Sequence, residues 1–285
     1  MKILVIGSSG SIGTHFINFL CSKKKIKQIF AIDKKTNKIN SKKIFFKKFD
    51  LENFKSNIYF GKRIDCAIML GAFLNFKDID PLEFYYKNML IFYNSIKVCK
   101  QNNIKKIIYL SSFAVYGDLN SSSINENFKL NGNNIYSQLK IFQEQELKKL
   151  SYIGNFKFNV LRLSQIYGSN ITTNIIYRFI EMKKINKTVE INGDGSQKRD
   201  FLFIDDLINA IYLTMIKFKA NEVFNVCSGI GITLKKVVDL IGVKYFLNKK
   251  KLREPKIVIG NNIKIKKTLN WKVKFDLEKG INKIN

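Results

Sequence analysis

Two residues spaced four apart, Tyr136 and Lys140, form the first pattern in the sequence that could carry chemistry. On a helix, residues i and i+4 share a face, so the Lys140 ammonium can lie beside the Tyr136 phenol and lower its pKa from about 10 towards the working range. A phenol tuned in this way can act as a general base. The same spacing also arises by chance in a chain rich in lysine, where the two residues would lie on the surface.

A run of hydroxyl residues favours the catalytic interpretation. Residues 111–117 read S-S-F-A-V-Y-G and directly follow an apolar stretch, residues 106–110, that predicts a buried strand. Doubly wound folds place their sites at the carboxyl ends of their strands. The hydroxyls of Ser111 and Ser112 are therefore expected at the carboxyl edge of the sheet, where Tyr136 could act as a general base.

Three glycines near the start of the chain predict a phosphate-binding turn. Gly7, Gly10 and Gly13 separate an apolar strand, residues 2–6, from a helical segment, residues 14–22. Glycine permits a tight turn and lets backbone N–H groups approach a pyrophosphate at a helix N-terminus. The spacing is one residue longer than the usual dinucleotide fingerprint, and by itself it also fits a plain turn.

Asp33 adds to the evidence for a dinucleotide. It follows a second predicted strand, residues 28–32, where its carboxylate can accept both adenosine ribose hydroxyls and repel a 2′-phosphate. NAD is therefore favoured over NADP. Lys34 and Lys35 could pair with that phosphate, so NADP stays open as an alternative.

Strands and helices alternate along the chain, which predicts an α/β fold: a doubly wound parallel sheet (Rossmann) with a smaller, irregular C-terminal substrate lobe. We expect an NAD-binding domain over residues 1–165, with a returning strand near 223–226, and a mainly substrate-binding lobe over residues 166–285. Further strands are predicted at 43–49, 66–70 and 158–163. Helices are predicted at about 81–102, 136–150, 173–184 and 205–216.

The net charge of +28 raises the question of nucleic acid, because basic patches mark proteins that bind it. However, 45 of the 50 basic residues are lysines, and arginine is the preferred base reader. Lysine has AT-rich codons, as do the abundant Asn, Ile and Phe. We therefore attribute the high lysine content to a base-composition bias of the genome and not to attraction to anions, and we expect no nucleic-acid partner.

The four cysteines form no C-x-x-C pair and the chain has a single histidine, His15, so no metal site is predicted and the thiols should be reduced. The apolar run at residues 1–6 stops too soon for a signal peptide, and no stretch is long enough for a membrane helix. We expect a cytoplasmic protein that forms a homodimer.

Taken in order along the chain, these motifs resemble the extended short-chain dehydrogenase/reductase family, in its NAD-dependent nucleotide-sugar epimerase and dehydratase branch. The resemblance spans nearly the whole chain. It rests on Gly7, Gly10 and Gly13, Asp33, Asp50-Leu51, Asn88, S-S-F-A-V-Y-G, Y-S-Q-L-K and G-D-G-S-Q-K-R-D-F, and on closing segments at 261–271 and 276–281.

The resemblance implies a role for each matching residue. Tyr136 is similar to the catalytic base, Lys140 to the residue that tunes it and holds the nicotinamide ribose, and Ser112 to the hydroxyl that shares the substrate proton. The implied cofactor-binding residues are Gly7, Gly10, Ser11, Ile12, Gly13, Asp33, Asp50, Leu51, Tyr136 and Lys140. The implied substrate-binding residues are Ser112, Asn88, Gln165, Arg199 and Arg253, with the two arginines on the nucleotide diphosphate.

Two departures narrow the function that the resemblance implies. Members that dehydrate sugars carry Asp-Glu where this chain has Phe113-Ala114, so dehydration is disfavoured. Gln165 replaces the family's usual Asn, which puts that substrate contact in doubt. We expect an NAD-dependent epimerase that acts on a nucleotide-diphosphate sugar through a transient keto intermediate. The alternatives are an NAD(P)H-dependent 4-keto nucleotide-sugar reductase and a non-catalytic relative that binds nucleotides or nucleic acid.

Overall fold

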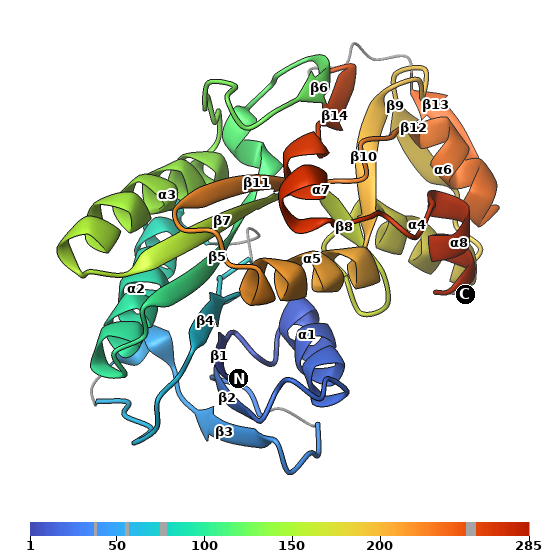
Figure 1. Ribbon diagram of the computed structural model, residues 1–285. Helices are drawn as coiled ribbons and strands as arrows, with labels where there is room; N and C mark the ends of the chain where they lie inside the picture. The colour runs from blue at the N-terminus through green and yellow to red at the C-terminus, as the bar shows by residue number, and fades with distance from the viewer. Residues whose placement is uncertain (37–38, 55–56, 75–78, 249–254, 285) are drawn as a thin grey trace.

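A seven-stranded parallel sheet forms the centre of the computed structural model, which describes residues 1–36, 39–54, 57–74, 79–248 and 255–284 (Figure 1). The strand order is β11-β7-β5-β4-β1-β2-β3, so the order reverses between β1 and β4. The bounds are β1 (Lys2–Ile6), β2 (Gln28–Asp33), β3 (Ile44–Lys48), β4 (Cys66–Met69), β5 (Lys106–Ser112), β7 (Lys157–Leu163) and β11 (Glu222–Val226). The predicted doubly wound fold is confirmed.

Helices cover both faces of this sheet, because its strands carry apolar side chains on both sides. α1 (Ser11–Cys21) and α5 (Ile204–Ile216) pack together on one face, and α2 (Pro81–Gln101) and α3 (Ile135–Ile153) pack together on the other (Figure 1). Side chains alternate along β5 accordingly: Ile108 joins the core under α1 and α5, whereas Ile107 and Tyr109 join the core under α2 and α3.

Local capping signals fix where the helices of the second face begin. Asp80 accepts hydrogen bonds from the backbone N–H groups of Leu82 and Glu83 at 2.8 and 3.1 Å, with Pro81 in the first turn of α2. Asn134 and Ser137 form a capping box at the start of α3. That cap sets Tyr136 and Lys140 in the first two turns of α3.

Smaller elements lie outside the large sheet, and most of them come from the C-terminal part of the chain, beside the carboxyl edge of that sheet (Figure 1). One further sheet has the order β12-β10-β14-β6, with β8 on β10, and β13 pairs with β9. The strands are β6 (Ser121–Ile124), β8 (Gln165–Tyr167), β9 (Val189–Asn192), β10 (Lys198–Phe203), β12 (Gly231–Thr233), β13 (Tyr245–Asn248) and β14 (Ile257–Gly260). The helices are α4 (Ile175–Lys184), α6 (Leu234–Ile241), α7 (Ile263–Leu269) and α8 (Leu277–Asn282), and the 3-10 turns are η1 (Leu51–Asn53) and η2 (Phe113–Tyr116).

Buried carboxylates connect this smaller part to the rest. Asp200 on β10 accepts hydrogen bonds from the backbone N–H groups of Ser228, Gly229 and Gly260, and Asp206 on α5 accepts from those of Lys274 and Phe275. The boundary predicted at residue 165 stays a prediction. In the part of the chain that the structure describes, no helix combines the length and the apolarity needed to cross a membrane.

Candidate functional site

A cleft runs along the carboxyl ends of the sheet strands, through the point where the strand order reverses. Its two larger cavities, of about 510 and 570 Å³, share Gly7 and Gly10 of the glycine turn. A third cavity of about 310 Å³ continues from the second and shares Ser112, Gln165 and Arg199 with it. Most of the residues singled out in the sequence therefore line one continuous cleft.

The glycine turn is built so that the first turn of α1 faces the second cavity. Gly7 has a φ of +81°, and a Cβ on Gly13 would lie 2.2 Å from the Gly7 carbonyl oxygen, so only glycine permits this close packing. Ser11, Ile12 and Gly13 line the cavity at a helix end that no side chain caps. Backbone N–H groups and the positive end of the helix dipole suit a pyrophosphate there.

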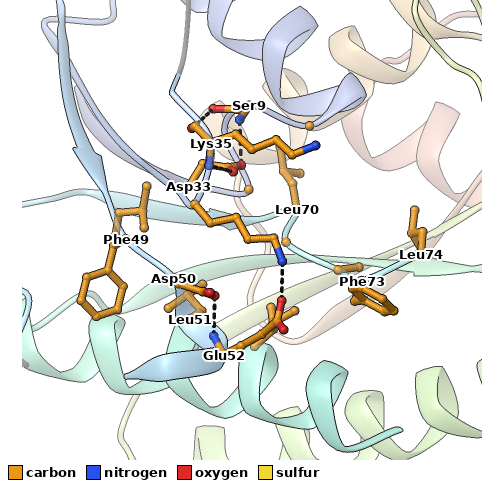
Figure 2. A pocket seen from close by; sticks show the side chains of 17 residues that line it. Ser9, Asp33, Lys35, Phe49, Asp50, Leu51, Glu52, Leu70, Phe73 and Leu74 are labelled. Atoms are coloured by element: carbon orange, nitrogen blue, oxygen red, sulfur yellow. Dashed lines mark hydrogen bonds and ion pairs between the residues drawn. The ribbon is translucent and has the colours of Figure 1, made fainter. Parts of the chain in front are cut away.

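Asp33, the last residue of β2, lies beside the glycine turn and lines the first cavity (Figure 2). Its two carboxylate oxygens accept hydrogen bonds from the backbone N–H groups of Ser9 and Lys35, both at 2.9 Å. Figure 2 shows Asp50 and Leu51 across the cavity from Asp33. Asp50 caps η1 by accepting from the N–H of Glu52 at 2.9 Å. A carboxylate, a short apolar wall and the glycine cradle together fit the adenosine and pyrophosphate of a dinucleotide.

Lys34 and Lys35, the two lysines next to Asp33, also line the first cavity. Lys34 Nζ forms an ion pair with Glu52 at 2.6 Å, which draws this lysine towards η1. The backbone of Lys35 is held at both ends, since its N–H donates to Asp33 and its carbonyl accepts from the Ser9 hydroxyl at 2.8 Å. Both lysines therefore lie within the lining that would meet a ribose.

Tyr136 and Ser112 lie together in the wall of the second cavity. Burial raises the pKa of Tyr136, and a hydrogen bond with Ser112 acts in the opposite direction. The lowered phenol pKa that we expected is therefore not found, because the cost of placing a phenolate in a buried site is the larger effect. The two hydroxyls are hydrogen-bonded to each other.

Lys140 is buried directly behind this wall, one helical turn after Tyr136. Its Nζ lies 5.9 Å from the centroid of the Tyr136 ring, but its hydrogen bonds go to the Tyr109 hydroxyl at 2.9 Å and the Leu110 carbonyl at 3.0 Å. Burial lowers the pKa of Lys140 to about 8, while Glu144 acts to raise it. The helical spacing brought the two residues together as predicted, but sequence reasoning missed Tyr109.

A second set of buried polar groups that the sequence did not reveal lies under the site. Glu144 forms an ion pair with Arg162 at 2.7 Å and accepts a hydrogen bond from the Ser111 hydroxyl at 2.5 Å. Arg162 also donates to the Tyr116 hydroxyl, which in turn donates to Asn225 at 2.7 Å. This network joins α3, β5, β7 and β11, and so fixes the strand ends that carry Ser112.

Asn88, expected from the resemblance to bind substrate, is not among the residues that line the three cavities described above. It is buried on α2, where its side chain holds the loop after β4 through two 3.0 Å hydrogen bonds with the backbone N–H and carbonyl of Phe73. Phe73 lines the first cavity (Figure 2). Asn88 therefore supports the cofactor side of the cleft by positioning its wall.

The substrate end of the cleft contains Gln165 on β8 and Arg199 on β10, which line both the second and the third cavity. Gln165 is exposed there, whereas Arg199 is largely buried. Arg253, the other predicted diphosphate ligand, lies outside the described residues. Phe113 and Ala114 line the third cavity and bring no titratable group to it.

In the described ranges, no three His, Cys, Asp or Glu side chains gather as metal ligands would. His15, the single histidine, contacts the Ser169 carbonyl at 2.7 Å through Nε2. The glycine turn and Asp33 line the part of the cleft that fits a dinucleotide, and Ser112 and Tyr136 bring hydroxyl groups to the adjoining cavity.

Comparison with known proteins agrees with this geometry. The sequence profile of the NAD dependent epimerase/dehydratase family matches residues 3–227. The chain is 28% identical over 302 residues to a putative UDP-glucose 4-epimerase of Methanocaldococcus jannaschii, covering 99% of this chain and 96% of that protein. It is 30% identical over 270 residues to the dTDP-D-glucose 4,6-dehydratase of Dictyostelium discoideum, covering 84% of this chain but only 62%, less than two thirds, of the dehydratase.

A solved structure has the same fold over the whole length. The UDP-glucuronic acid 4-epimerase of Bacillus cereus, solved in complex with UDP-glucuronic acid and NAD, superposes with a TM-score of 0.86 at 21% identity. The match covers 100% of this chain and 98% of that one.

Proposed function

The chain belongs to the NAD-dependent epimerase/dehydratase family, and from that premise we propose that it epimerises a nucleotide-diphosphate sugar through a transient keto intermediate. NAD is the cofactor of this family, and the glycine cradle and Asp33 fit it. The observation that carries the proposal is the placement of Tyr136 and Ser112 in one cavity wall, between the glycine turn and Arg199.

NAD, when bound, supplies the acceptor and donor of hydride in this chemistry. Tyr136 takes the proton of a sugar hydroxyl as the carbon that bears it becomes a ketone, and returns the proton when the ketone is reduced on its other face. Ser112 hydrogen-bonds to Tyr136 and shares that proton. Lys140 places an ammonium group behind the phenol and favours its anionic form.

The substrate class follows from the far end of the cleft. Arg199 is a permanently charged donor that suits a diphosphate, and Gln165 offers an amide to the sugar or phosphate. Dehydration needs a further acid and base beside the catalytic hydroxyl, and Phe113 and Ala114 occupy those positions. This supports epimerisation over dehydration, although one of the relatives is a dehydratase.

A one-way 4-keto nucleotide-sugar reductase is the second candidate. Lys34 and Lys35 favour it, because both line the adenosine side of the cleft and suit the 2′-phosphate of NADPH. The same Ser112, Tyr136 and Lys140 would then return a proton to the substrate in only one direction.

The two candidates differ in what they consume, so one experiment separates them. Purified protein is incubated with UDP-, dTDP- and GDP-sugars without added reductant, and the products are resolved by anion-exchange chromatography and NMR, with Tyr136→Phe as the control. Conversion to a C4 epimer with no net NADH supports the proposal. NAD(P)H oxidation that occurs only with a 4-keto sugar, and no epimer, refutes it in favour of the reductase.

We also propose a homodimer. α2 exposes Leu82, Tyr86 and Tyr93 along its length, an apolar surface that a second copy would bury. Light scattering after gel filtration tests this, and a monomer of 33.1 kDa at micromolar concentration refutes it. The cytoplasmic location expected from the sequence stays a prediction.

A further inference from the structure

Lys140 is held by a hydroxyl that the chemistry described above does not use. The Tyr109 hydroxyl accepts a hydrogen bond from Lys140 Nζ at 2.9 Å, and Nζ also lies 4.7 Å from the centroid of the Tyr109 ring. Both residues are buried, Tyr109 on β5 and Lys140 on α3. An ammonium in such a place needs acceptors, because burial without hydrogen bonds disfavours its charged form.

The orientation of that hydroxyl is fixed from its other side. Tyr109 donates to Gln143 Oε1 at 2.5 Å, which turns the oxygen lone pairs of the phenol towards Lys140. Gln143 in turn donates from Nε2 to the Asn88 carbonyl at 3.2 Å. The side chain of Asn88 holds Phe73 in the wall of the first cavity, so one chain of hydrogen bonds connects that wall with Lys140.

We propose that Tyr109, oriented by Gln143, is a positioning residue that keeps Lys140 charged and in place behind Tyr136. This deepens the proposed function and rests on it for the contact of Lys140 with NAD and for its role in turnover. Tyr109 is not among the residues that line the three cavities, and its hydroxyl contacts Lys140 directly, so we assign its effect on the chemistry to Lys140. A purely structural tyrosine would fill the same core space with its ring and would leave the protonation of Lys140 unchanged.

The other charged and titratable groups around Lys140 are accounted for. Tyr136 and Glu144 flank it on α3, and Arg162 on β7 lies beyond Glu144. Burial raises the pKa of Tyr109, so this phenol stays uncharged near neutral pH. Burial also raises the pKa of Tyr136, while its hydrogen bond with Ser112 acts to lower it. Glu144 is already shared between Arg162 and Ser111, which leaves the Tyr109 hydroxyl and the Leu110 carbonyl as the acceptors of Lys140.

The pH dependence of NAD affinity, measured by isothermal titration between pH 6 and 9.5, tests the proposal without any sugar. Because burial lowers the pKa of Lys140 to about 8, affinity should be level below that pH and fall as pH rises through it. Tyr109→Phe removes an acceptor of the ammonium and keeps the ring. In this variant we expect the break in the profile to move about one pH unit lower. At a pH above both breaks, the charged fraction of Lys140 is then about tenfold smaller than in the wild type.

Two further variants make the result decisive. Gln143→Leu should move the break in the same direction by a smaller amount, and it serves if Tyr109→Phe fails to fold. Tyr93 donates a hydrogen bond to Glu146 at 3.0 Å, and neither residue lines the cleft. Tyr93→Phe loses that hydrogen bond and should leave the pH profile of NAD affinity unchanged. A break at the wild-type pH in folded Tyr109→Phe or Gln143→Leu refutes the proposal. Absence of sugar turnover with a shifted break would refute only the epimerase function.

Discussion

The glycine turn makes two different demands at two of its positions, and substitution by alanine separates them. A Cβ on Gly13 would lie 2.2 Å from the Gly7 carbonyl oxygen and 2.8 Å from the backbone carbon of Ser8. Both are backbone atoms, so no side chain can move to relieve the overlap. α1 would have to shift away from β1, although Phe16, Ile17 and Leu20 anchor it in the core.

The cost of Gly13→Ala follows from this overlap. Overpacking of a well-packed core costs typically up to about 3 kcal/mol, and we expect the upper end, because the contacts are with backbone. At about 2 °C for each kcal/mol in a chain of this size, Tm should fall by about 6 °C. NAD affinity should fall as well, because the shifted helix carries the N–H groups that bind the pyrophosphate.

Gly10→Ala is the matched control. Its φ and ψ of −69° and 169° suit alanine, and a Cβ there meets only the Gly7 carbonyl oxygen, at 3.4 Å. Apart from this contact, the added methyl group enters the cleft. A change of the cap residue costs about 1 kcal/mol, so we expect the Tm of Gly10→Ala to stay within about 2 °C of the wild type. NAD should bind about 10- to 100-fold more weakly, since a methyl group overpacks the site by about 1–3 kcal/mol.

Differential scanning fluorimetry and isothermal titration with NAD measure both effects on the same samples. If Gly13→Ala has the Tm of the wild type, the close packing of α1 on the turn is wrong. If Gly10→Ala binds NAD as tightly as the wild type, the turn is not the phosphate site. Loss of stability in both variants would mean that the turn is a structural element only.

Three other outcomes follow from the same cleft. Tyr136→Phe should keep Tm and NAD affinity but lower turnover by about 10² to 10⁴, the usual range for a positioned acid–base group; an unchanged rate removes Tyr136 from the mechanism. Protein purified without added cofactor should release NAD on denaturation, which chromatography of the released nucleotide detects. Asp33→Ala should empty the site and raise the affinity for NADP relative to NAD, which titration with each nucleotide measures. Binding to generic DNA should be weak and vanish as salt rises through physiological strength, and nanomolar binding there would contradict a solvated lysine surface.

The parts of the site that the sequence could predict are those set by local pattern. A continuous apolar run, three glycines and an amphipathic segment define β1, the turn and α1 within a few residues, because each requirement is met by neighbours in the chain. Asp33 follows from the same logic, as the first polar residue after a buried strand. The helical period likewise brings Tyr136 and Lys140 to one face, but it says nothing of what that face packs against.

The contacts that the sequence could not predict depend on which element lies over which. Tyr109 reads as one more buried residue of an alternating strand, and only the packing of α3 on β5 turns its hydroxyl into a partner for Lys140. Asn88 was expected on the substrate side from the family resemblance alone, and its hydrogen bonds to the Phe73 backbone could not be read from the sequence. The prediction of a lowered Tyr136 pKa was wrong for the same reason. The spacing accounts for the charge of Lys140, whose Nζ lies 5.9 Å from the centroid of the Tyr136 ring, but not for the burial of the phenol. A buried polar side chain must find partners wherever the fold offers them, so its role is decided by tertiary packing and not by its neighbours in sequence.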